Sequence, residues 1–229
     1  MPAAEAQLPF ELEWEAVPLP ELPLLQELCL WRDVLFRNGL IGLTADGIGY
    51  GNLSVRSGPG AQFFITGTGT GGLPHMSAEH CSEVLEVELH RPRIRCRGLV
   101  RPSSESLSHA ALYLCSPAIG AVAHVHDAAL WHRLRGKLPT ATALGYGTPE
   151  LAADIQRLVR EHRLIPSGVI VMGGHQDGLL SFGQTLCEAV TLLLRLRSEQ
   201  GVTEPEYSAL RALPRAESRA PDPQDTVRQ

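Results

Sequence analysis

Two histidines, His124 and His126, stand at the end of a short apolar stretch, and a third, His175, follows another inside the segment MGGHQDG. In a β-strand, residues i and i+2 point to the same face, so the first two imidazoles would lie side by side. Three imidazoles around a divalent ion, with positions left open to substrate, are typical of a catalytic metal site. The alternative is structural, because a lone HxH can simply mark the polar end of a strand and His175 alone can cap a turn.

Glu105 is the candidate acid–base residue. It ends the segment RPSSE and precedes SLSHAALYLC, which is expected to be helical. A carboxylate beside a metal can move a proton to and from a bound substrate. The simpler interpretation is that the helix dipole favours a glutamate in the first turn. His109 follows four residues later and can share a helix face with Glu105, so its role stays open.

Small residues in loops form a second group of candidates. Free backbone N–H groups and hydroxyls at glycine-rich turns and at a helix start can cradle a phosphate without lysine or arginine. Ordinary turn and N-cap chemistry also explains each of them separately. The candidate substrate- or phosphate-binding residues are Asn52, Thr68, Gly69, Ser103 and Ser104.

Alternating strands and helices must position these residues. Apolar spacing predicts helices from about residue 21 to the Asn38-Gly39 stop, from about 102 to 115, from 127 to 135, from 149 to 162 and from 186 to 196. Short apolar or alternating runs predict strands near 53–55, 62–66, 84–89, 94–96, 119–125, 168–172 and 178–182. This order indicates an α/β or α+β fold in a single domain.

Composition sets the domain limits. The chain has 229 residues, enough for one domain with a full core. Prolines at 18, 20 and 23 predict an extended N-terminal arm over residues 1–20. The domain itself is expected at 21–200. Residues 201–229 are rich in Pro, Arg, Glu and Asp and are expected to form a polar, partly disordered tail.

Charge and cysteine usage exclude several classes of protein. A net charge of -5 without a basic cluster argues against nucleic-acid binding. No apolar run reaches the roughly 20 residues of a membrane span, and the N-terminus lacks a signal-peptide pattern, so no membrane partner is expected. Five widely spaced cysteines without a CxxC motif fit reduced, buried thiols and a cytoplasmic location.

An ordered set of segments resembles the class II aldolase/adducin family. The set is GNLSVR at 51–56, FFITGTG at 63–69, RPSSE at 101–105, AVAHVH at 121–126, YGTPEL at 146–151 and GGHQDGLLSFG at 173–183. The resemblance spans about residues 25 to 200. It implies a central, mostly antiparallel sheet flanked by helices, and a homo-oligomer, commonly a tetramer.

The resemblance also implies site roles. It assigns His124, His126 and His175 to a divalent metal, commonly Zn²⁺ with Mn²⁺, Fe²⁺ or Co²⁺ as alternatives, and Glu105 to acid–base catalysis. Asn52, Thr68, Gly69, Ser103 and Ser104 match the positions that hold a substrate phosphate in the family. The implied activity is an aldehyde-lyase of carbohydrate metabolism that acts on a small hydroxy-carbonyl compound through a metal-stabilised enediolate.

Other activities remain open alternatives. The same site can serve epimerisation, dehydration or decarboxylation, and a non-catalytic, adducin-like interaction module is the alternative from another class. The chain departs from the sugar-phosphate aldolases in its GTGTGG loop, in Asp127 after the HxH pair and in Gln-Asp-Gly after His175. The segment between His126 and Tyr146 is short and contains no counterpart of the aldolases' tyrosine proton donor.

Overall fold

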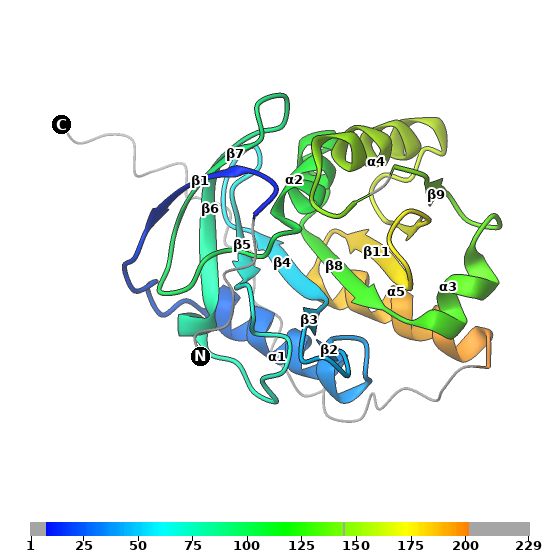
Figure 1. Cartoon of the computed structure of the whole chain (residues 1–229), viewed down its shortest axis with the longest axis horizontal. Helices are drawn as coiled ribbons and strands as arrows, with labels where there is room; N and C mark the ends of the chain where they lie inside the picture. Colours follow the sequence, from blue (N-terminus) through cyan, green and yellow to red (C-terminus); the bar gives the residue numbers. More distant parts are fainter. Residues whose placement is uncertain (1–7, 144, 202–229) are drawn as a thin grey trace, which may run out of the picture.

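A nine-stranded sheet organises the protein, whose computed structural model describes residues 8–143 and 145–201 (Figure 1). In spatial order its strands are β1 (Glu11–Glu15), β7 (Arg93–Arg97), β6 (Cys81–Glu88), β5 (Phe63–Thr66), β4 (Asn52–Arg56), β8 (Ala121–His126), β11 (Gly178–Gly183), β10 (Gly168–Met172) and β9 (Thr140–Ala141). Only the edge strands β1 and β9 pair in parallel with their neighbours. The expected mostly antiparallel sheet is therefore confirmed.

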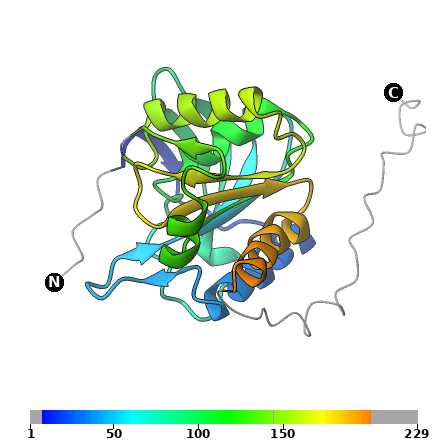
Figure 2. The same cartoon turned by 90° about the vertical axis from the view of Figure 1, so that its right-hand side faces the viewer.

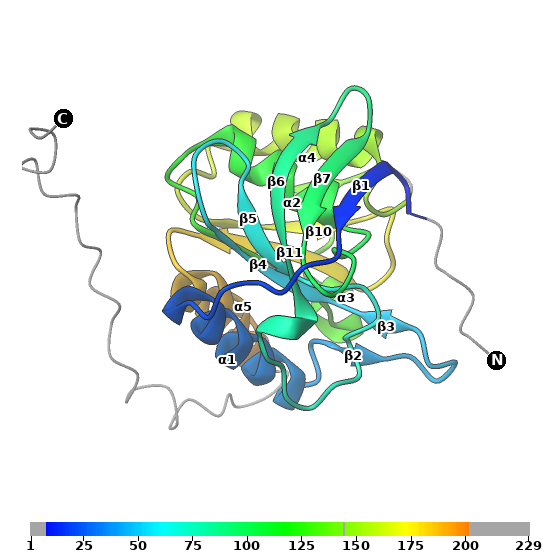
Figure 3. The same cartoon turned by 90° about the vertical axis from the view of Figure 1, so that its left-hand side faces the viewer.

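Helices cover both faces of the sheet (Figure 3). Among the described residues the α-helices are α1 (Pro23–Arg37), α2 (Ser106–Cys115), α3 (Ala128–Leu134), α4 (Pro149–Glu161) and α5 (Leu186–Glu199). Helices α1 and α5 lie on one face, and α2 and α4 lie on the other. Two separate apolar clusters result, one on each face.

Side-chain alternation along β8 decides which face carries the histidines. Ala123 and Val125 belong to the apolar cluster beneath α1 and α5, whereas Val122 belongs to the cluster beneath α2 and α4. Because side chains alternate along a strand, His124 and His126 share the face of Val122. The pair is thus directed toward the side of the sheet that carries α2.

Local signals in the sequence explain where the helices begin. The side chains of Asp127, Thr148 and Thr185 accept hydrogen bonds from backbone N–H groups in the first turns of α3, α4 and α5. Pro149 occupies the first turn of α4, where its missing N–H costs nothing. The predicted positions of all five helices are confirmed within a few residues.

The N-terminal arm contains a strand that the sequence analysis did not predict. Strand β1 lies within the arm and pairs with β7, so that its glutamates face alternate arginines, and Arg93 binds Glu13 at 2.7 Å. The sequence analysis also did not predict a small hairpin, which projects beside the sheet in Figure 2. It consists of β2 (Gly42–Leu43) and β3 (Gly49–Tyr50). Residues 1–7 of the arm, and the expected tail after Gly201, lie outside the described residues.

The cysteine prediction holds only in part. All five thiols are free, and Cys29, Cys81 and Cys96 are buried as expected. Cys115 is half-buried and Cys187 is exposed on α5, so the expectation of five buried thiols is wrong. No helix in the described part of the chain is long and apolar enough to cross a membrane.

Candidate metal centre

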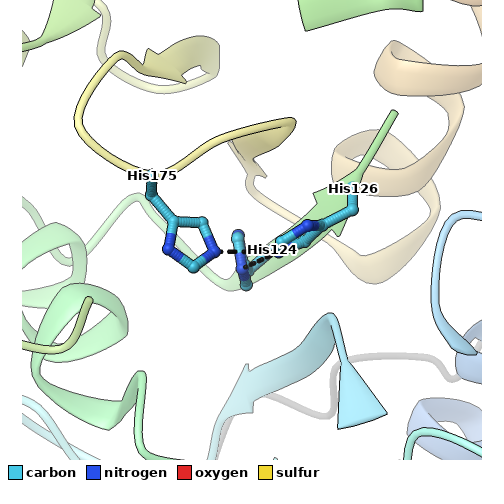
Figure 4. A group of neighbouring side chains, drawn as sticks. All are labelled: His124, His126 and His175. Carbon is cyan, nitrogen blue, oxygen red and sulfur yellow. Dashed lines mark hydrogen bonds between the residues drawn. The ribbon is translucent and has the colours of Figure 1, made fainter. Parts of the chain in front are cut away.

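Three histidines, two from strand β8 and one from the turn between β10 and β11, converge at one end of the sheet (Figure 4). His124 and His126 end β8, and His175 lies in the turn between β10 and β11. Strand β11 pairs with β8 so that Gly178 stands opposite His126. The backbone N–H of Asp127 also donates to the Asp177 carbonyl at 2.9 Å, which fixes the turn beside the strand end.

The ring nitrogens are spaced as metal ligands. His126 Nε2 lies 3.2 Å from His124 Nε2 and 2.9 Å from His175 Nε2. Tetrahedral zinc with nitrogen ligands at about 2.0–2.1 Å places those nitrogens about 3.3 Å apart. Nitrogen lone pairs repel one another at such distances unless a proton or a cation lies between them. The observed spacing therefore fits a single divalent ion.

The protonation state of the histidines also fits a metal site. Burial and the neighbouring imidazoles lower the pKa of His124 well below its ordinary value. Burial likewise lowers the pKa of His126, to about 4, and that of His175. His124 Nδ1 lies 3.3 Å from the Leu179 carbonyl, which favours the tautomer with Nδ1 protonated and Nε2 free. The site thus presents neutral imidazoles, the form that binds metals.

A glycine makes room for the third histidine. A Cβ atom at Gly178 would lie 2.5 Å from His175 Cδ2 and 3.3 Å from His124 Cε1. Real Cβ atoms essentially never come within 3.0 Å of such a neighbouring atom, so the first of these contacts would force a shift. The glycine after Gln176-Asp177 is therefore required for His175 to face His124.

Glu105 lies next to this cluster, in a buried position at the N-cap of α2. Its Oε1 atom is 3.8 Å from His124 Nε2, and its Oε2 atom accepts a hydrogen bond from Ser108 Oγ at 2.9 Å. Burial raises the pKa of Glu105 to about 7, although the Ser108 hydroxyl and the Gly147 N–H favour the ionised form. A glutamate held only by the helix dipole would show a lowered pKa. In the metal-free protein this carboxyl can therefore gain or lose a proton near neutral pH.

His109 is not one of the three clustered histidines, although its charge contributes to lowering the pKa of His124. Its Nδ1 atom lies 2.6 Å from Ser54 Oγ, which in turn lies 2.8 Å from the Tyr113 hydroxyl. Burial lowers the pKa of His109 to about 3. His109 and Tyr113, both on α2, are thus linked to β4 through the buried Ser54 hydroxyl.

The candidate phosphate-binding residues fall in three adjoining segments. Asn52 stands opposite His124 across β4 and β8, and its buried Oδ1 atom makes no hydrogen bond with the described residues. The Thr68 N–H donates to the Arg101 carbonyl at 2.9 Å, which places the Thr68–Gly69 turn beside the segment that carries Ser103 and Ser104. No hydrogen bond among the described residues links Thr68 or Gly69 to the histidines.

Two tyrosines that the sequence analysis missed lie beside the cluster. The Tyr50 ring centroid is 5.3 Å from that of His126, and the Tyr146 ring centroid is 5.6 Å from that of His175. Each tyrosine stands in a Gly-Tyr-Gly tripeptide, a repetition visible in the sequence. A third missed residue is Arg32 on α1, whose buried guanidinium donates to the Thr70 and Gly71 carbonyls at 2.8 Å and so holds the GTGTGG loop.

The fold and the site together define a family. The family model "Class II Aldolase and Adducin N-terminal domain" matches residues 26–198, and the chain belongs to this family. Class II aldolases are generally enzymes that use divalent metals. No curated protein sequence matches the chain.

Solved structures with the same fold include aldolases. The structure titled YgbL, a putative aldolase/epimerase/decarboxylase from Klebsiella pneumoniae, is 22% identical, with a TM-score of 0.59 over 78% of this chain and 87% of that one. An L-fuculose 1-phosphate aldolase is 20% identical, with a TM-score of 0.61 over 80% of this chain and 85% of that one. At these identities the likeness establishes the fold alone.

Proposed function

We propose that the protein is a divalent-metal-dependent aldehyde-lyase of the class II aldolase type, acting on a small hydroxy-carbonyl compound such as a sugar phosphate. One observation carries the proposal: the buried carboxyl of Glu105 lies beside three histidines whose ring nitrogens are spaced like the ligands of one metal ion. Glu105 Oε1 is 3.8 Å from His124 Nε2, and burial raises the pKa of Glu105 to about 7. An interaction module has no need of such a combination.

Each residue has a chemical task in this proposal. His124, His126 and His175 would hold the metal, which supplies Lewis-acid stabilisation of negative charge on substrate oxygens. Glu105 takes a proton from the substrate and returns it, with Ser108 and Gly147 orienting the carboxylate. Zinc is the first expectation for a three-histidine set, and manganese, iron and cobalt are the alternatives.

The substrate would lie between the metal and α2. The unpaired Oδ1 atom of Asn52 is available to accept a hydrogen bond from a substrate hydroxyl or water. The N-terminus of α2 and the exposed Thr68–Gly69 turn favour an anionic group on the substrate, and Ser103 and Ser104 directly precede the N-cap of α2 in the chain. These residues are the proposed phosphate subsite.

The proton-transfer step can be tested before the natural substrate is known. Exchange of the α-protons of hydroxyacetone, or of its phosphate, into deuterated water needs only a metal and a base, and proton NMR follows it. We expect zinc-loaded Glu105→Gln protein to keep its metal and to lose at least about 100-fold in exchange rate. Glu150→Gln, which alters an exposed glutamate in the first turn of α4, is the matched control and should retain the wild-type rate.

Three outcomes would contradict the proposal. Equal exchange in wild-type and Glu105→Gln protein would remove Glu105 from the chemistry. Absence of exchange by the metal-loaded wild type would exclude hydroxy-ketone substrates of this kind. Failure to retain zinc, manganese, iron or cobalt in metal analysis would reject the metal site. Cleavage, epimerisation, dehydration and decarboxylation are then separated by product analysis of active compounds.

We also propose a cytoplasmic homotetramer that binds neither nucleic acid nor membrane. The free thiols support a reducing compartment, because none of the five cysteines forms a disulfide. Leu43 and Ile48 on the projecting β2–β3 hairpin are 50% and 66% exposed, which supports burial against another subunit. Sedimentation that shows a monomer at micromolar concentration would exclude the tetramer.

A further inference from the structure

Two Gly-Tyr-Gly tripeptides lie beside the histidine cluster, each against a different histidine. Residues 49–51 place Tyr50 against His126, and residues 145–147 place Tyr146 against His175. The two tyrosine rings lie against different histidines of the cluster, and they come from segments almost one hundred residues apart in the chain. The tyrosines are therefore positioned independently around the same centre.

The two phenol groups differ in their surroundings. The Tyr50 hydroxyl lies 3.5 Å from the Gly39 carbonyl and would be 2.8 Å from a Cβ atom at Gly42, so it is directed at the backbone before the hairpin. The Tyr146 side chain is exposed, and its hydroxyl makes no hydrogen bond with the described residues. Tyr146 is thus the tyrosine whose phenol is free to bind a ligand.

The backbone around Tyr146 is fixed although its side chain is exposed. Gly147 has a φ of 62°, and a Cβ atom there would lie 2.0 Å from the Ser104 carbonyl oxygen. The Gly147 N–H donates to the Glu105 carboxylate, and Thr148 caps α4 by accepting from the Leu151 N–H at 3.2 Å. The tyrosine is held between the acid–base candidate on one side and His175 on the other.

We propose that Tyr146 is a substrate-contacting residue whose phenolic O–H donates a hydrogen bond to a substrate oxygen held at the metal centre. This inference rests on the proposed function, because it needs a metal at the three histidines. A donor aimed at an oxygen that carries negative charge forms one of the stronger hydrogen bonds in proteins. Tyr50 packs on His126 and has no direct role in binding.

A hydroxamate tests this contact without any turnover. Acetohydroxamate binds zinc through two oxygens that share a negative charge, and calorimetry measures its affinity for the zinc-loaded protein. We expect Tyr146→Phe to weaken the binding by roughly 10–100-fold, as for the loss of a hydrogen bond to a charged group. Tyr146→Ala should weaken it to a similar extent, Tyr50→Phe should stay within about twofold of wild type, and zinc affinity should be unchanged in all three.

The possible failures are distinguishable. Equal hydroxamate affinity in wild-type and Tyr146→Phe protein would overturn the Tyr146 contact and leave the proposed function standing. A loss in Tyr146→Ala alone would assign the ring a packing role and would also overturn it. Zinc-loaded wild type that does not bind the hydroxamate would overturn the contact. Wild type that binds no metal would refute the proposed function and this inference with it.

Discussion

Gly178→Ala should disrupt the proposed metal centre by a purely steric route. The new Cβ atom would lie 2.5 Å from His175 Cδ2, and ordinary van der Waals contact begins at 3.4 Å. The His175 ring must therefore move by about 0.9 Å, whereas metal–ligand distances tolerate only about 0.2 Å. The strand has little freedom to shift, because β11 is paired with β10 on one side and with β8 on the other, where Gly178 stands opposite His126.

The expected effect is a loss of metal affinity with the fold retained. Changes to the groups that orient a metal ligand typically cost about 10–100-fold in affinity, and we expect Gly178→Ala to lose at least that much. Zinc affinity is measured by competition with a chromophoric chelator, and circular dichroism checks the fold. His175→Ala gives the value expected for complete loss of the third ligand.

Gly49→Ala is the matched control. A Cβ atom at Gly49 would meet its nearest neighbour, the Gly71 nitrogen, at 3.5 Å, which is an ordinary contact. This variant should bind zinc as the wild type does. Zinc affinity within threefold of wild type in a folded Gly178→Ala protein would refute the argument that this glycine makes room for His175.

Three further predictions concern stability and are measured by urea unfolding. Burial raises the pKa of Glu105 to about 7 in the metal-free folded protein, whereas a glutamate of the unfolded chain has a pKa of about 4.3. Between these two pH values the folded protein keeps a proton that the unfolded chain has released. The free energy of unfolding therefore falls as the pH rises from about 4.3 to about 7. Glu105→Gln removes that fall and should exceed wild-type stability above pH 7 by up to about 4 kcal/mol; parallel pH curves would contradict this. Ser54→Ala should cost about 2–4 kcal/mol, because it removes the buried partner of both His109 and Tyr113, and a cost below about 1 kcal/mol would count against that account. Arg32→Lys should lower the free energy of unfolding by a similar amount, because an ammonium group lacks the planar fork with which Arg32 reaches several carbonyls. The same variant should speed amide hydrogen exchange in the Gly67–Leu73 loop. Unchanged exchange there would exclude a role of Arg32 in holding the loop.

Local patterns in the sequence determined much of the fold. The two-residue period of a strand predicts that His124 and His126 share a face. Thr148 and Thr185 stand at the starts of α4 and α5, where their side chains accept hydrogen bonds from backbone N–H groups of the first turn. Such signals depend on neighbouring residues alone, so they can be read without a structure. Strand β1 was not predicted because it forms only by pairing with β7, about eighty residues away in the chain.

The site itself depends on contacts between distant segments. Residue spacing made His175 a candidate, but only the pairing of β11 with β8 brings its Nε2 atom within 2.9 Å of His126 Nε2. The raised pKa of Glu105 arises from burial, which a sequence pattern does not report. The place of Tyr146 was decided in the same way, because its tripeptide reaches His175 only once Gly147 packs against Ser104. Residue types and spacing thus identified the chemical groups, and tertiary packing set the distances and the burial on which their chemistry depends.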